Sequence, residues 1–218
     1  MIKKYKTTLI ITLIVTLFPM LIGILLWERL PMEIATHFQF DGTADKFSSK
    51  DFAVFTMPLT MTLLQLVAMY FTLNDPKKKN MGDKMLKIVF WIVPCVSLVT
   101  HLSIYANAME VGMDMSTVSQ LVIGVLLVLI GNYLPKTKQN YSIGIRTPWT
   151  LNDEENWNKT HRFGAWIFVV CGLLMIANIF IKLQFLMFAA LGFLCLPVLY
   201  SFLLYKKSKG DRSDDPTQ

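Results

Sequence analysis

The sequence predicts an all-α membrane protein whose six helices each cross the bilayer. The chain is 54% hydrophobic and only 17% charged, which is too apolar for an ordinary soluble domain. Its charges crowd into short segments, and six long windows between these segments carry no charge. Each window holds about 19 to 23 residues, enough for a helix to span a hydrocarbon core of about 30 Å. The windows are residues 7–27, 52–73, 88–109, 115–134, 163–181 and 183–205.

The connections between these windows favour a compact helical bundle, because most of them are too short for anything but antiparallel neighbours. A transmembrane β-barrel would need apolar and polar residues in alternation, and runs such as LVIGVLLVLIG lack it. We expect two halves. Residues 1–109 hold spans one to three, and residues 110–218 hold spans four to six.

Lysine and arginine alternate along the chain in a way that predicts its orientation. Of the 21 basic residues, 17 lie before span one, between spans two and three, between spans four and five, or after span six. Four lie in the remaining loops. By the positive-inside rule, both termini are therefore expected in the cytoplasm of a multi-pass bacterial membrane protein. The net charge of +6 is then explained by topology, and we expect no direct contact with nucleic acid.

Prolines and capping residues predict where helices begin or bend. Proline in a span can create a hinge or a cavity, or only the ordinary curvature of a bundle, and both readings stay open. Serines 48 and 49 are suited to cap the start of span two, and Thr150 followed by Asp153 resembles a capping box for a short helix that leads into span five. The polar tail after span six is expected to be disordered. The prolines inside the windows are Pro19, Pro58, Pro94 and Pro197.

The outer loop, residues 28–51, contains a candidate ligand-binding cluster. His37, Asp41 and Asp45 recur every four residues, which would suit a metal ion if the stretch were helical. The Asp41-Gly42 pair is a turn signal and argues against a continuous helix. We therefore prefer a folded loop whose acids pair with nearby lysines or with a ligand, and we expect neither a metal nor a cofactor.

The inner loop, residues 135–162, combines aromatic and basic side chains. Tryptophan suits the headgroup zone, where its ring has one wet and one apolar side, and cations there can hold lipid phosphates. The same cations could instead hold acidic side chains of a protein partner. Both interpretations, interfacial anchoring and a partner surface, remain open. The residues expected to make these contacts are Arg146, Trp149, Trp157, His161 and Arg162.

Both loops resemble the Sdp immunity protein (SdpI) family of bacterial membrane proteins. Residues 30–50 resemble the family pattern LP-x-x-I-P-x-H-F-N-x-x-G-x-x-D-x-x-x-S-K, with Ala35 in place of proline and Gln39 in place of asparagine. Residues 131–162 carry N-x-x-x-GIRTPWTL followed by W-x-x-THR. The matching residues are Leu30, Pro31, Ile34, His37, Phe38, Gly42, Asp45, Ser49 and Lys50 in the first stretch, and Asn140, Gly144 to Leu151, Trp157, Thr160, His161 and Arg162 in the second.

The resemblance implies a function in immunity, namely protection of the cell against a secreted toxic peptide that collapses the membrane potential. It also implies that capture of the toxin recruits a cytosolic transcriptional repressor to the membrane. We predict that the outer loop binds the peptide and that the inner loop senses occupancy or meets the partner. The predicted peptide-binding residues are His37, Phe38, Asp41, Asp45 and Lys50.

Catalysis and transport are the competing classes of function. The sequence has neither an H-E-x-x-H motif nor paired aspartates within a span, so we do not expect an enzyme. An intramembrane enzyme would have to depend on His101 or His161. His101 lies deep in span three, where we expect it to bond to a neighbouring helix. A small-solute or lipid-handling transporter is the stronger alternative, although so few charges at depth leave no visible ion relay.

Overall fold

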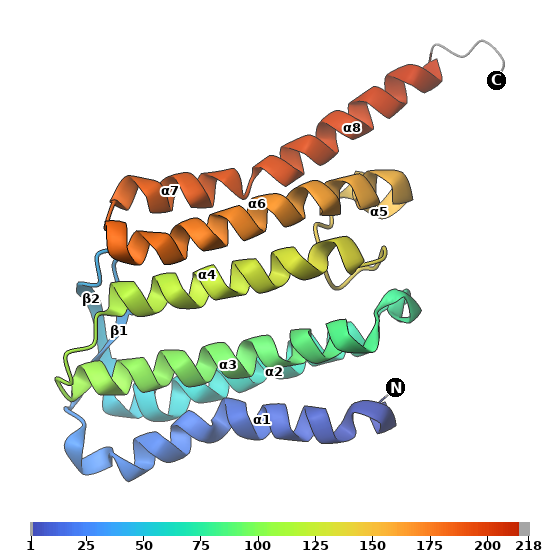
Figure 1. The fold of residues 1–218 in the computed structure, drawn as a ribbon. Helices are drawn as coiled ribbons and strands as arrows, with labels where there is room; N and C mark the ends of the chain where they lie inside the picture. Colours follow the sequence, from blue (N-terminus) through green and yellow to red (C-terminus); the bar gives the residue numbers. More distant parts are fainter. Residues whose placement is uncertain (1, 214–218) are drawn as a thin grey trace. The chain divides into compact units, whose positions relative to one another are not determined.

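A computed structural model describes residues 2–213 of the chain (Figure 1). It confirms the predicted fold class, because six helices within this described part are long and apolar enough to cross a membrane. The fifth span begins at Glu154, before the start of the predicted window at residue 163, because the helix continues into polar sequence. The six spans are Lys4–Leu25, Phe52–Leu73, Asp83–Ala108, Met115–Lys136, Glu154–Ile181 and Phe185–Lys209.

The chain forms two compact units. Unit 1 comprises Met1–Asn74 and Asp83–Val122, and unit 2 comprises Asp75–Gly82 and Ile123–Gln218. Helix α4 (Met115–Tyr133) therefore contributes its first turns to unit 1 and the rest to unit 2.

Unit 1 packs three long helices against one another and places a β-hairpin at one end. Its buried apolar cluster includes Leu30 and Ile34 from the hairpin region, Val54 from the start of span two, and Ile104 and Tyr105 from the third helix. The hairpin thus shares one core with the helix ends. The elements are α1 (Ile2–Leu25), η1 (Trp27–Arg29), β1 (Glu33–Phe38), β2 (Ala44–Ser49), η2 (Phe52–Thr56), α2 (Met57–Leu73) and α3 (Asp83–Ala108).

Two polar side chains inside unit 1 make different kinds of hydrogen bond. The Gln65 amide on α2 donates to the Phe90 carbonyl on α3 at 2.8 Å, which joins two helices where water is absent. His101 behaves differently from the prediction. Its Nδ1 donates to the Ser97 carbonyl of its own helix at 2.7 Å, and its Nε2 has no partner within the described part of the chain.

Unit 2 is built around α6 (Glu154–Ile181), against which the remainder of α4 packs closely. A Cβ atom on Gly172 would lie 2.5 Å from the Gly124 carbonyl oxygen, so glycine is needed for the two backbones to approach. Leu127, Cys171 and Met175 are part of the buried apolar cluster beside this contact. The other elements are η3 (Lys78–Asn80), η4 (Leu134–Lys136), α5 (Pro148–Asn152), α7 (Gln184–Phe193) and α8 (Leu196–Ser213).

Two of the four prolines coincide with irregular backbone. Pro58 follows the π-helical turn η2, and Pro197 lies in the first turn of α8, just after the sixth span breaks between α7 and α8 (Figure 1). Pro19 and Pro94 lie inside continuous helices. The prediction of a disordered tail is wrong for residues 206–213, because α8 continues through them, and residues 214–218 lie outside the described part.

Candidate functional site

Residues 33–49, within the predicted outer loop, form an antiparallel β-hairpin that the sequence did not predict. β1 pairs with β2 in a register that joins Glu33 to Ser49 and Phe38 to Ala44. Ile34 is 1% exposed and Phe38 half-buried, so alternate side chains of β1 face the core of unit 1. The predicted cap of span two is confirmed, since Ser49 Oγ accepts from the Phe52 amide at 3.3 Å.

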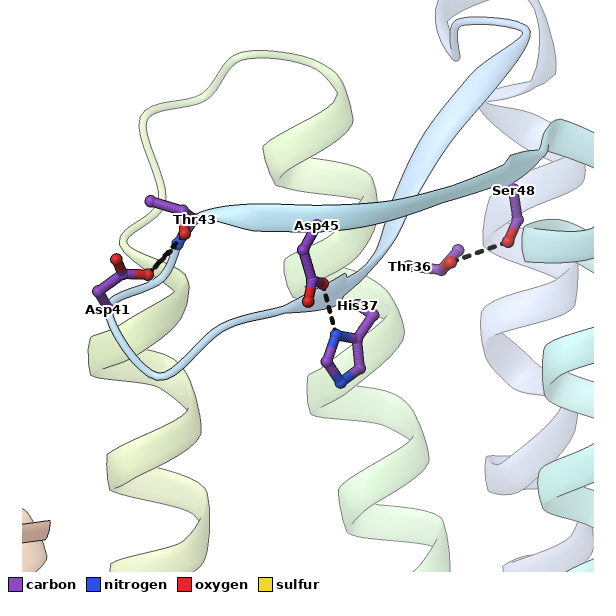
Figure 2. Close-up of polar contacts among 6 residues, drawn as sticks. All are labelled: Thr36, His37, Asp41, Thr43, Asp45 and Ser48. Carbon is purple, nitrogen blue, oxygen red and sulfur yellow. Dashed lines mark hydrogen bonds and ion pairs between the residues drawn. The ribbon is translucent and has the colours of Figure 1, made fainter. Parts of the chain in front are cut away.

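The hairpin turns at Asp41 and Gly42, as the sequence predicts. Gly42 adopts a φ of 88°, which other residues rarely reach. Asp41 Oδ1 accepts from the amide of Thr43 at 2.9 Å and from its hydroxyl at 2.7 Å (Figure 2). These bonds, led by the hydroxyl, hold the pKa of the Asp41 carboxyl below its ordinary value.

The turn is held against the first turn of α4. Ser116 Oγ donates to the Phe40 carbonyl at 2.9 Å, and a Cβ atom on Gly42 would lie 3.0 Å from the Ser116 amide nitrogen. Asp114 accepts from the Ser116 amide and from the Thr117 hydroxyl, which fixes the start of α4. The hairpin tip therefore has a defined position within unit 1.

His37, Asp41 and Asp45 do not converge on one point. His37 Nδ1 donates to Asp45 Oδ1 at 2.5 Å across the strands, while Asp41 is engaged with Thr43 in the turn (Figure 2). Across residues 2–213, no group of three His, Cys, Asp or Glu side chains could hold a metal ion. The hairpin thus carries a cross-strand hydrogen bond between His37 and Asp45 and, separately, a turn carboxylate.

Three large apolar side chains of the hairpin region are exposed among its polar residues. Met32, Phe40 and Phe47 are 76%, 53% and 61% exposed. Lys50, which the sequence placed among the peptide-binding residues, is instead buried at 8% exposure. Its ammonium donates to the Trp27 carbonyl at 2.9 Å and lies 4.9 Å from the Trp27 ring centroid, so it ties the end of β2 to η1.

The inner motif forms a folded loop in unit 2, residues 135–153, which we call the GIRTPWTL loop. Trp157 at the start of α6 is completely buried, and its indole donates to the Thr137 carbonyl at 2.7 Å. The His161 ring stacks on Trp157, donates from Nδ1 to the Trp157 carbonyl, and accepts at Nε2 from the Ile145 amide at 3.1 Å. Trp157 and His161 therefore support the loop from inside, whereas the sequence reading placed them at a contact surface.

Gly144 explains why the motif begins with glycine. Its φ is 116°, and a Cβ atom there would collide with the His161 ring. The histidine ring can therefore reach the backbone of the loop only because residue 144 has no side chain. The GIRTPWTL segment and the W-x-x-THR segment therefore pack directly against each other.

The structure has two helix caps in this region, where the sequence predicts one at Thr150. Thr147 and Thr150 form a reciprocal capping box at the start of α5, because Pro148 is suited to the first helical position. Asp153 is itself the cap of α6, where its side chain accepts from the Asn156 amide at 3.0 Å.

Asp75 is the main polar residue that the sequence reading missed. It is 2% exposed, and its Oδ2 accepts from the Tyr141 amide at 2.9 Å and the Ser142 hydroxyl at 2.6 Å. Its Oδ1 accepts from the Lys77 amide at 2.7 Å. The Asn-Asp-Pro turn signal after span two could have indicated this role.

Gln139 extends the same network across the loop. Its amide donates to the Thr150 and Leu151 carbonyls at 2.9 Å, and its Oε1 accepts from the Lys77 ammonium at 2.5 Å. Gln139 therefore connects the segment after span two, through Lys77, with α5, through the Thr150 and Leu151 carbonyls.

Exposed side chains of this region lie on two sides of the loop. Arg146 is exposed and donates to the Tyr141 carbonyl, and Arg162 is exposed on α6. Trp149 is half-buried, donates to Ser201 Oγ at 2.7 Å and stacks on Tyr205. A cleft of about 850 Å³ opens beside it and is lined by Trp149, Asp153, Glu154, Glu155, Tyr205 and Lys209, among others.

Comparison with known proteins finds one relative that covers both regions. Immunity protein SdpI of Bacillus subtilis (strain 168) is 28% identical over 211 residues, which cover 93% of this chain and 98% of that protein. The family model described as SdpI/YfhL protein family matches residues 136–204. The chain is therefore similar to the SdpI/YfhL family over residues 136–204, and to Immunity protein SdpI over nearly its full length. With its six spans, it is a multi-pass bacterial membrane protein.

The family match covers the GIRTPWTL loop and the helices α5 to α8 that hold it. A second model, described as a domain of unknown function (DUF1648), matches residues 14–62, which run from α1 through the hairpin to the start of α2. No solved structure matches the chain. The SdpI/YfhL family is not a known enzyme family.

Proposed function

We propose that this chain is a membrane immunity protein that protects its cell against a secreted toxic peptide. The observation that carries the proposal is the near full-length similarity to a protein named Immunity protein SdpI. The hairpin supports it, because the chain has a rigid, partly apolar surface within the stretch that resembles the family pattern.

We propose that the hairpin faces the cell exterior and that the GIRTPWTL loop faces the cytoplasm. The distribution of lysine and arginine among the loops supports this orientation. Single cysteines at positions 41 and 146, in a background without the native cysteines, can be labelled in intact cells with an impermeant maleimide. Label at position 41 and none at position 146 is expected, and the reverse pattern would refute the orientation.

The peptide would lie on the exposed face of the hairpin. Met32, Phe40 and Phe47 offer apolar contact area, and the His37–Asp45 pair offers polar contacts beside it. An amphipathic peptide could place its apolar side on these rings. The hydrogen bonds of the turn and the contact with α4 hold the hairpin in place, so little ordering free energy would be lost on binding.

Survival of a sensitive host tests this proposal. Cells that express the chain are challenged with spent medium from the species that encodes it and from Bacillus subtilis (strain 168). Wild type should survive, whereas Phe47→Ser and His37→Ala should reduce survival at equal protein level. Val111→Ser is the matched control, because Val111 is 66% exposed outside the hairpin. If both media kill cells that express the wild-type chain, the immunity function is refuted.

We also propose that the GIRTPWTL loop meets a cytosolic transcriptional repressor. Support comes from the exposed Arg146 and from the cleft that Trp149 lines together with the oppositely charged Glu154 and Lys209. The chain offers a route for a signal, because α4 begins beside the hairpin turn and its last residue precedes η4 and the loop.

Copurification of the repressor tests the second proposal. Membranes from cells that carry the chain and a tagged repressor encoded nearby are collected with and without the active medium. The repressor should move to the membrane only when the medium is present, and Arg146→Ala should reduce that fraction. A repressor that remains soluble with the wild-type chain would refute recruitment while leaving immunity intact.

A further inference from the structure

A groove on the surface of unit 2 lies outside the surfaces discussed above. It has a volume of about 420 Å³. One wall is formed by Gly131, Asn132 and Pro135 from the end of α4 and from η4. Arg162, Ala165 and Trp166 of α6 form the facing wall, so the groove follows the crossing of two membrane-spanning helices.

The groove exists because the residues at its floor are small. A Cβ atom on Gly131 would lie 2.9 Å from the Ala165 carbonyl oxygen and 2.8 Å from a methyl group of Val169. The two backbones are therefore already in close contact, and no side chain from either helix fills the space above them. Its size lies within the usual range of small-ligand sites.

One end of the groove is cationic. The Arg162 guanidinium is exposed and has no ion-pair or hydrogen-bond partner among residues 2–213. The Asn132 side chain lines the facing wall and supplies a neutral amide donor. An anion with several oxygen atoms, such as a phosphate diester, matches this pair of donors.

The rest of the groove is apolar and belongs to the bilayer. Arg162 is the last charged residue before the uncharged window 163–181. Along a helix, Trp166 lies about 6 Å beyond Arg162 and Val169 about 10 Å beyond it. The headgroup region on each side of a bilayer is about 5 to 8 Å thick, so an anion held by Arg162 in that region would place Val169 at the depth of the acyl chains. Trp166 is 74% exposed, so its ring forms an open apolar side of the groove.

We propose that this groove binds one anionic phospholipid. Its phosphate would contact Arg162 and Asn132, and one acyl chain would lie along Ala165, Trp166 and Val169. This inference goes beyond the immunity function, because its ligand is a component of the membrane. A free phosphate could satisfy the cationic end but would leave the apolar part of the groove unfilled.

Native mass spectrometry of the purified full chain tests the proposal. The protein in detergent is titrated with phosphatidylglycerol or with phosphatidylcholine of the same chain length. Wild type should retain phosphatidylglycerol preferentially, and Arg162→Gln should reduce that retention about fivefold, the effect expected of one arginine near an anionic surface. Trp166→Ala should lower retention of both lipids.

Lys159→Gln is the matched control, because Lys159 is an exposed cation on the same helix and is already paired with Glu155 at 2.6 Å. It should retain phosphatidylglycerol as wild type does, and all variants should unfold at the wild-type temperature without lipid. Equal retention by wild type and Arg162→Gln, or equal retention of the two lipids by wild type, would overturn the proposal. Displacement of the lipid by inorganic phosphate would overturn it as well.

Discussion

Removal of the Asp75 carboxylate is expected to open the GIRTPWTL loop. The side chain is buried and accepts three hydrogen bonds, from the Lys77 and Tyr141 amides and from the Ser142 hydroxyl. Asp75→Ala would leave these three donors without their acceptor. At about 1 to 2 kcal/mol for each donor, the free energy of local opening should fall by about 3 to 6 kcal/mol.

Limited trypsin digestion followed by mass spectrometry measures this change. Cleavage after Lys138 or Arg146 requires the loop to open, so its rate follows the population of the open form. A loss of 3 kcal/mol corresponds to about a hundredfold faster cleavage. Asp75→Asn keeps one acceptor oxygen in place and should give an intermediate rate.

The control is Asp153→Ala in the same loop. That carboxylate accepts a single amide hydrogen bond, from Asn156, and its removal should cost only about 1 kcal/mol. Cleavage of Asp75→Ala at the wild-type rate, or no faster than that of Asp153→Ala, would show that the network around Asp75 does not hold the loop.

Three further predictions concern other contacts. Gly172→Ala should lower the unfolding temperature in detergent, at a cost of about 1 to 3 kcal/mol, because its methyl group would press on the Gly124 carbonyl; Gly192→Ala, where nothing lies within 4 Å, should not. Lys50→Met should reduce the amount of folded protein, because Lys50 is buried and its ammonium is bonded to the Trp27 carbonyl. A variant that is expressed at the wild-type level but no longer protects the cells would contradict this. The hydrogen bonds that lower the pKa of Asp41 stabilise the turn fully above about pH 4, and this contribution is lost as the pH falls through the folded pKa. The protection factor of the residue 43 amide against hydrogen exchange should therefore fall in acid for wild type but not for Asp41→Asn.

The spans and the hairpin turn could be predicted from sequence because each depends on local chemistry. An uncharged window of about 20 residues has few alternatives to a membrane helix, and the Asp41-Gly42 turn needs only its own residues and Thr43. The strands on either side of that turn could not be predicted. They depend on Ile34 packing into a core whose other members come from distant helix ends.

The roles of the loop residues required the tertiary structure. Tryptophan near a bilayer normally indicates an interfacial anchor, and this interpretation was wrong for Trp157, whose indole finds an acceptor at Thr137 inside unit 2. The role of Asp75 was not predicted because its partners are distant in the sequence. Its three donors include two from residues more than 60 positions away, and no periodic pattern reports such a contact.

Burial of the GIRTPWTL motif determines which effect its substitutions should have. Asn140, Thr150, Thr160 and His161 are at most 1% exposed, so the matched positions chiefly preserve the shape of the loop. Substitution of any of them should reduce protein level and function together. A residue that contacts a partner should instead reduce function at unchanged protein level. Arg146, which is exposed, is the member of the motif for which this second result is expected.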